Sequence, residues 1–211
     1  MSTPLPWISP SDADDMLYDD PMGSMPDFGY ALLRKTAKGK TNSVADLARA
    51  KLQPSKPNDR DWLADGLWPI TCASHRIFTA PGVAVEPGAL ESIFHDYDAK
   101  AKAHQKLLAV VLTYRFPHSW QPADILSLVG MYALEKLALQ RRLTSMTVVH
   151  MPGDELSARR PHAHVLCLSR VQRSSGWGEV HPDLVAKTAQ TQFQQEWEQF
   201  YDIWVPRYRD G

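Results

Sequence analysis

The feature that most constrains this chain is the short run Pro-His-Ala-His-Val-Leu at residues 161–166. It consists of β-compatible residues with no helix cap, so it predicts a strand. Alternate side chains of a strand lie on one face, which places His162 and His164 together with their Cβ atoms about 7 Å apart. Two imidazoles at this spacing can bind one metal ion from a rigid sheet, where the ion would polarise a phosphate or carbonyl oxygen.

A third histidine ends a second β-rich run, Leu-Thr-Ser-Met-Thr-Val-Val-His at residues 143–150. The turn residues 151–154 follow it, and they predict a short return of the chain that would bring His150 beside His162 and His164. Three neutral imidazoles leave coordination positions open, so they suit a catalytic metal better than a closed structural one. The alternative interpretation is that all three histidines are exposed residues of a sheet.

Composition indicates one ordinary globular domain. The chain has 211 residues, of which 44% are hydrophobic and 22% charged, with a net charge of −1. Nucleic-acid binding would therefore depend on local clusters of cations rather than on overall charge. Two cysteines, Cys72 and Cys167, fit a reducing compartment. No apolar run is long enough to span a membrane and the N-terminus has no secretory pattern, so we expect a cytoplasmic protein with no membrane partner.

Charge is distributed unevenly along the first 60 residues. Residues 1–30 are rich in Asp, Pro, Met and Ser, and we expect them to form an acidic, flexible arm ahead of a domain over residues 31–211. The segment 34–60 is basic, and further arginines flank the histidine run. The residues expected to contact phosphates are Arg34, Lys35, Lys38, Lys40, Arg49, Lys51, Arg159, Arg160 and Arg170. Alternatively, the basic segment is a solvated surface that pairs with the acidic arm.

The order of expected elements predicts an α+β domain. The run 107–115 reads as a buried strand, and an amphipathic helix follows from residue 121 to about 142. The two histidine-bearing strands come next, and a last helix covers residues 182 to about 204. We expect a largely antiparallel sheet with helices on one face, which leaves the other face to hold the histidines.

Taken in this order, the residues from about 105 to 204 resemble the MobA/MobL family of plasmid mobilisation relaxases, which belongs to the HUH (histidine–hydrophobic–histidine) endonucleases. The resemblance rests on the Pro-His-Ala-His strand, the upstream Val149-His150 and the helix containing Gln195-Glu196-Trp197. It implies an HUH relaxase-like fold and a metal triad of His150, His162 and His164. It also implies that the triad binds Mg²⁺ or Mn²⁺ at a scissile DNA phosphate.

The chain departs from the family at the nucleophile. The family places a tyrosine on a helix after a Ser-Ala-Val-Ala-like run, and the matching run here is residues 43–50, where that position falls near Arg49 or Ala50. Tyr30, just before the basic segment, and Tyr201, on the last helix, are candidate substitutes. Water activated at the metal is a further alternative to a tyrosine.

Three hypotheses follow. The first is a metal-dependent nickase of single-stranded or hairpin DNA at a plasmid or mobile-element origin, which would work with other mobilisation or replication proteins. The second is a catalytically impaired, relaxase-like DNA-binding protein that lacks the nucleophilic tyrosine. The third is an unrelated three-histidine metallohydrolase acting on a small molecule.

Overall fold

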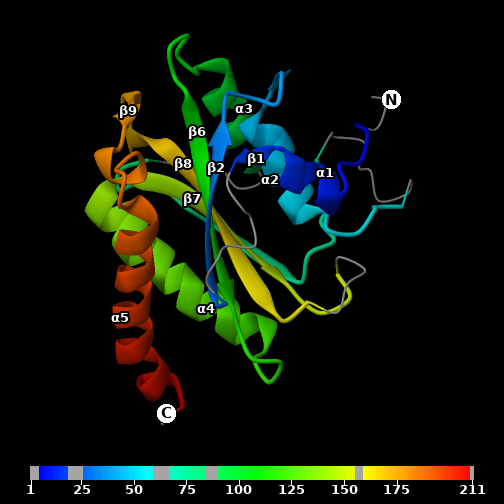
Figure 1. Ribbon diagram of the computed structural model, residues 1–211, viewed down its shortest axis with the longest axis vertical. Helices are drawn as coiled ribbons and strands as arrows, with labels where there is room; N and C mark the ends of the chain where they lie inside the picture. The colour runs from blue at the N-terminus through cyan, green and yellow to red at the C-terminus, as the bar shows by residue number, and fades with distance from the viewer. Residues whose placement is uncertain (1–4, 19–25, 59–66, 84–89, 155–158, 210–211) are drawn as a thin grey trace.

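The computed structural model describes residues 5–18, 26–58, 67–83, 90–154 and 159–209. These residues form an α+β structure around a seven-stranded antiparallel sheet (Figure 1). The strands are β1 (Leu17–Tyr18), β2 (Phe28–Arg34), β5 (Ser74–Phe78), β6 (Leu107–Arg115), β7 (Leu143–His150), β8 (His162–Arg173) and β9 (Gly176–Val180). Their order is β1-β2-β6-β8-β7-β5, and β9 pairs with the later part of β8. A separate hairpin joins β3 (Thr36–Ala37) to β4 (Lys40–Thr41).

Helices cover both faces of the sheet (Figure 1). One face carries α4 (Pro122–Tyr132), which continues into the π-helical η2 (Ala133–Leu139), together with η3 (Pro182–Leu184) and α5 (Ala189–Arg209). The other face carries α1 (Pro10–Asp15), α2 (Val44–Leu52) and α3 (Leu90–Ala99). We call these the α5 face and the α2 face. No helix in the described ranges is long and apolar enough to cross a membrane.

The expected α+β class with an antiparallel sheet is confirmed, but the expectation that helices cover only one face is wrong. The reason lies in the two central strands, β6 and β8, which are buried on both faces over most of their length. In β6, Val110 and Leu112 belong to the core on the α5 face, whereas Ala109 and Val111 belong to the core on the α2 face. Apolar side chains on both faces require a helical layer on each side.

The N-terminal segment is part of the fold where the structure describes it. Ala13 and Leu17 are 1% and 4% exposed and belong to the core on the α2 face. Ser9 caps α1, because its hydroxyl accepts a hydrogen bond from the Asp12 amide. The expected boundary between residues 30 and 31 falls inside β2, a strand that pairs with β6. Residues 1–4 and 19–25 of the expected arm lie outside the described residues.

Aromatic packing attaches α5 to the sheet. Trp197 is 7% exposed, and its ring centroid lies 4.0 Å from that of Tyr114 on β6 and 5.4 Å from that of Tyr132 on α4. Such contacts bury large apolar areas and add aromatic pair interactions. Trp197 therefore connects three elements of the α5 face.

Replacing Trp197 with alanine is expected to lower the free energy of unfolding by about 3–5 kcal/mol, because it leaves a large cavity between three elements. Ile203→Ala is the matched control on the same helix, since Ile203 is 54% exposed; its effect should stay within about 0.5 kcal/mol. Urea denaturation followed by circular dichroism measures both. Equal effects of the two variants would contradict this role for Trp197.

Candidate metal centre

The register of three strands assembles the three histidines. His150 of β7 pairs directly with His162 of β8, and His164 lies two residues further along β8, opposite Val148 on one side and Thr113 on the other. Their β8 neighbours Ala163 and Val165 point into the core on the α5 face, so the histidines point to the α2 face. One ligand atom from each ring lies within 4.8 Å of the other two.

Each imidazole is oriented by a protein oxygen. Nε2 of His150 lies 2.7 Å from the carbonyl oxygen of Lys51, in the last turn of α2. Nδ1 of His162 lies 2.9 Å from the carbonyl oxygen of Arg160, and Nδ1 of His164 lies 2.9 Å from the Thr113 hydroxyl oxygen. A ring nitrogen that donates to such an oxygen fixes the tautomer, so the other nitrogen carries the lone pair that a metal needs.

The three rings are buried, which excludes the alternative of exposed sheet residues. His150, His162 and His164 are 1%, 6% and 7% exposed. Burial, reinforced by the positive charge of Lys51 and by the neighbouring histidines, holds the pKa of His164 well below its usual value. His164 is therefore neutral at neutral pH, which is the state that coordinates a metal.

The donor set fits a divalent metal ion. Nε2 of His164 is buried and has no hydrogen-bond partner among the described residues, and a buried polar atom without a partner is costly unless a ligand satisfies it. The ring centroids lie 4.9–5.3 Å apart in edge-to-face arrangements. Three imidazoles converging in this way leave open positions for a substrate oxygen, as catalytic metal sites require.

Arginines surround the mouth of this centre. His162 and His164 line a cavity of about 220 Å³ whose other lining residues are Asp14, Thr113, Arg115, Arg159 and Arg160. Arg159 and Arg160, which were expected to contact phosphates, therefore lie beside the histidines. Guanidinium groups bind phosphate oxygens in a bidentate geometry. The site thus combines metal ligands with cations suited to a phosphodiester.

Arg115, Thr113 and Asp14 also border the histidines, although the sequence did not point to them as site residues. Arg115 ends β6 and pairs with His162 across the sheet, and Thr113 pairs with His164. A signal was available for both, because an arginine at the end of a buried strand is unusual and Thr113 interrupts an apolar run. No local signal pointed to Asp14, whose position depends on how α1 packs against α2.

Two of the residues expected to contact phosphates, Arg49 and Arg170, place their charged groups inside the fold. Arg49 is 2% exposed, and its guanidinium donates to the carbonyl oxygen of Pro6 at 2.6 Å. Arg170 is 4% exposed and donates to the carbonyl oxygens of Lys100, Trp177 and Gly178 at 2.6–2.7 Å. Both arginines are structural, since their guanidinium groups are already used inside the fold.

The basic segment and the acidic helix α1 are paired in part. Lys51 forms an ion pair with Asp14 at 3.6 Å, beside the histidines, and Lys38 forms one with Asp15 at 2.8 Å. The expected pairing with the acidic arm therefore occurs for both lysines, but only Lys38 lies on the surface, because Lys51 is 4% exposed. Lys40 is exposed on β4. Arg34 and Lys35 line a different pocket, at the other end of β6.

Neither candidate tyrosine lies on the face of the histidines. Tyr30 is 5% exposed on the α5 face, and its hydroxyl donates to the carbonyl oxygen of Leu184 at 3.0 Å. The alternation of β2 directs Tyr30 away from the histidines. Tyr201 packs against Trp120 and Trp197 on the α5 face.

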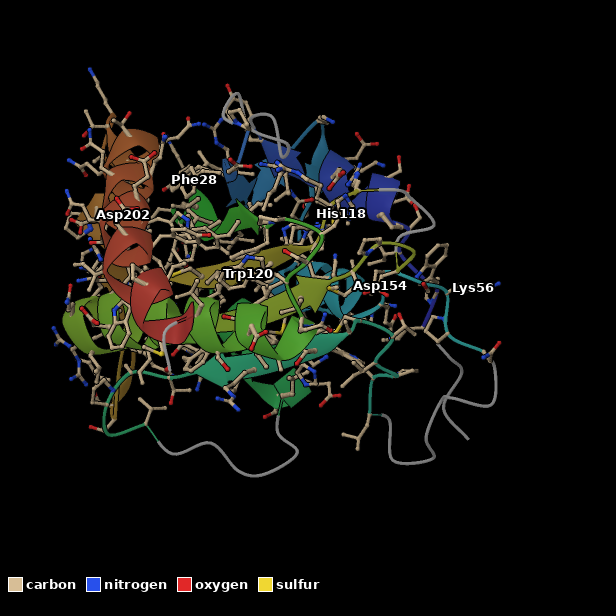
Figure 2. The ribbon with its side chains drawn as sticks, turned by 90° about the horizontal axis from the view of Figure 1, so that it is seen from below. Phe28, Lys56, His118, Trp120, Asp154 and Asp202 are labelled. Atoms are coloured by element: carbon tan, nitrogen blue, oxygen red, sulfur yellow. The ribbon has the colours of Figure 1, made fainter. Side chains whose placement is uncertain are left out.

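Tyr201 nevertheless lies close to the end of the sheet that carries the histidines. It lines a pocket of about 490 Å³ with Arg115 and Arg160, the two arginines that also line the histidine cavity. Figure 2, a view onto this end of the molecule, shows two residues of that pocket, Phe28 and Asp202, on the side of α5. Lys56 and Asp154 lie on the opposite side in the same view.

Comparison with solved structures identifies the fold. A protein solved in work on the molecular basis of vancomycin resistance transfer in Staphylococcus aureus is 17% identical, with a TM-score of 0.62 over 86% of this chain and 92% of that chain. Two structures of the conjugative relaxase TrwC with oriT DNA, one copper-bound and one metal-bound, are 14% and 13% identical. Both cover 77% of this chain and 64% of TrwC, with TM-scores of 0.39 and 0.38.

The likeness to the protein from the work on vancomycin resistance transfer shows that this chain shares that protein's fold, and it agrees with the expected α+β class. TM-scores below 0.5 leave the TrwC similarity without weight for the fold. No protein-family model and no curated protein sequence matches the chain.

Replacing His164 with alanine is expected to weaken Mn²⁺ binding by at least about a hundredfold, because a ligand is lost. Thr113→Val keeps the side-chain volume but removes the oxygen that orients His164, and it should weaken binding by roughly ten- to a hundredfold. Isothermal titration calorimetry measures both affinities.

The control for these variants is His118→Ala, since His118 is exposed and lies outside the cluster. It should bind Mn²⁺ as the unmodified protein does. Equal affinity of the His164→Ala and His118→Ala variants would show that the three histidines do not form a metal centre.

Proposed function

We propose that this chain is a metal-dependent, relaxase-like nickase that acts on single-stranded or hairpin DNA at a plasmid or mobile-element origin. The observation that carries the proposal is the buried cluster of His150, His162 and His164, with ligand atoms within 4.8 Å of one another and three arginines nearby. The proposal includes MobA/MobL membership, a cytoplasmic location, and cooperation with other mobilisation or replication proteins.

The residues divide into two roles in this proposal. The three imidazoles would hold Mg²⁺ or Mn²⁺, and the bound ion would polarise the scissile phosphate. Arg115, Arg159 and Arg160 bind the phosphate oxygens on either side of the scissile bond, and this fixes the strand in place before reaction. Thr113 and the Lys51 carbonyl keep the imidazoles in position.

Tyr201 is our proposed nucleophile. Its hydroxyl loses its proton as the oxygen attacks the phosphorus, the bond from phosphorus to the 3′ oxygen breaks, and the departing 3′ oxygen takes up a proton. The 5′ end then remains attached as a phosphotyrosine ester. The pocket shared with Arg115 and Arg160 supports this assignment. Reaching the phosphate requires either that α5 shifts or that the strand bends around the end of the sheet.

A second candidate function is DNA binding without cleavage. Arg49 occupies the region where the family carries its tyrosine, and it is buried and hydrogen-bonded within the fold. Helix α2 therefore offers no nucleophile there. This observation favours a protein that recognises origin or hairpin DNA and leaves the strand intact.

Incubating the protein with single-stranded DNA and Mn²⁺, followed by a denaturing gel, tests the nickase proposal. Cleavage should occur with the unmodified protein and with His118→Ala. Cleavage should fall by at least about a hundredfold in His162→Ala, because the metal that stabilises the transition state is lost. DNA that binds but stays intact over a broad set of origin sequences would support the second candidate instead.

The nucleophile is tested by intact-mass analysis of the same reactions. The unmodified protein should gain the mass of the downstream fragment, whose 5′ phosphate is formed at the nick, and Tyr201→Phe should abolish the adduct because the ring remains without its oxygen. Tyr30→Phe should still form it, since the Tyr30 hydroxyl is bonded to Leu184. Cleavage with no adduct in any variant would assign the attack to water.

A further inference from the structure

A second cationic pocket lies at the opposite end of the sheet from the histidines. It has a volume of about 820 Å³ and lies between the end of β2, the start of β6 and the segment from η3 into α5. Arg34 of β2 pairs with Leu107 of β6 at this end. Nothing in the proposed reaction uses this pocket.

The charge of this pocket is of one sign. Its lining includes Arg34, Lys35, Lys106 and Lys187, and it includes no aspartate or glutamate. None of the ion pairs found among the described residues involves any of these four cations. Cations gathered without counter-charges repel one another, so this surface favours an anionic ligand.

The hollow extends beyond one pocket. A neighbouring pocket of about 370 Å³ shares His104, Gln105 and Lys106 with the first and continues past the ion pair of Lys102 and Glu179. Their combined extent exceeds that of a single phosphate group. A ligand with several phosphates in a row matches this extended surface.

The walls of the pocket also suit nucleobases. Leu32, Leu107 and Val185 provide apolar surface between the cations. The Arg34 guanidinium carbon lies 3.6 Å from the centroid of the Tyr18 ring, and Tyr18 is 47% exposed. Arginine planes and aromatic rings are the surfaces on which unpaired bases stack. Tyr18 does not line the pocket, but its contact with Arg34 places a base-stacking surface beside the cations of the pocket.

The distance between this pocket and the histidines sets the minimum length of a ligand that contacts both sites. Six residues of β6 separate Leu107, in this pocket, from Thr113, beside His164. At about 3.3 Å per residue this is roughly 20 Å along the strand. The pocket also lies on the α5 face, whereas the histidines lie on the α2 face. A ligand that reaches both sites must therefore be a polymer.

We propose that this pocket binds the phosphates and bases of a DNA segment that flanks the segment held at the histidines. The inference rests on the proposed function for the identity of the polymer. It extends that function by assigning a second, separate contact with the same strand, which would fix how the strand lies across the protein.

Binding of a labelled 30-nucleotide single strand, measured by fluorescence anisotropy at several salt concentrations, tests the inference. The pocket variant is Lys35→Gln, Lys106→Gln and Lys187→Gln. The control variant is Lys56→Gln, Arg76→Gln and Arg173→Gln, which removes the same charge from exposed residues outside both pockets. The pocket variant should bind roughly tenfold more weakly than the control, and its slope of log K against log salt should be smaller by about two.

Two further measurements separate this inference from the proposed function. Mn²⁺ affinity at the histidines should be the same in both variants. If the strand binds and the two variants bind it equally, the inference is overturned while the proposed function stands. If a mononucleotide binds the pocket as tightly as the strand does, the ligand is a free nucleotide and the inference is also overturned. If the unmodified protein binds no DNA at all, both fail.

Discussion

The pairing of β8 with β6 on one side and β7 on the other is the constraint on which the rest of the structure depends. Because side chains alternate along β8, Ala163 and Val165 fill the core on the α5 face while His162 and His164 face α2. A slip of one residue would turn both histidines into the apolar core and expose apolar residues in their place. The same register that stabilises the core therefore positions the candidate metal ligands.

The histidine cluster lies where α2, β6, β7 and β8, which are distant in sequence, come into contact. The carbonyl oxygen of Lys51 at the end of α2 accepts from His150, and this also satisfies one of the helix-end carbonyls that lack a partner within the helix. Leaving a buried ring nitrogen such as Nε2 of His164 without a partner costs about 1–3 kcal/mol. A metal ion bound to Nε2 of His164 would remove this cost, so the site favours occupation by a metal ion.

Although the net charge of the chain is small, its surface has two cationic regions. One is the group of arginines around the histidines, and the other is the pocket of Arg34, Lys35, Lys106 and Lys187. Ion pairs between α1 and the basic segment neutralise Lys38 and Lys51. Arg160 is also paired, with Asp27. The cations of the two regions lie at two ends of one sheet, which suits a long polyanion better than a compact one.

The sequence by itself determined the strand character of residues 162–168, the shared face of His162 and His164, and the α+β class, because these follow from local periodicity and element order. Only the tertiary structure decided that Arg49 and Arg170 are structural, that Tyr30 faces away from the histidines, and that Thr113, Arg115 and Asp14 border the cluster. Strand register and helix packing join residues up to about 150 positions apart, and such contacts leave no periodic signal in the chain.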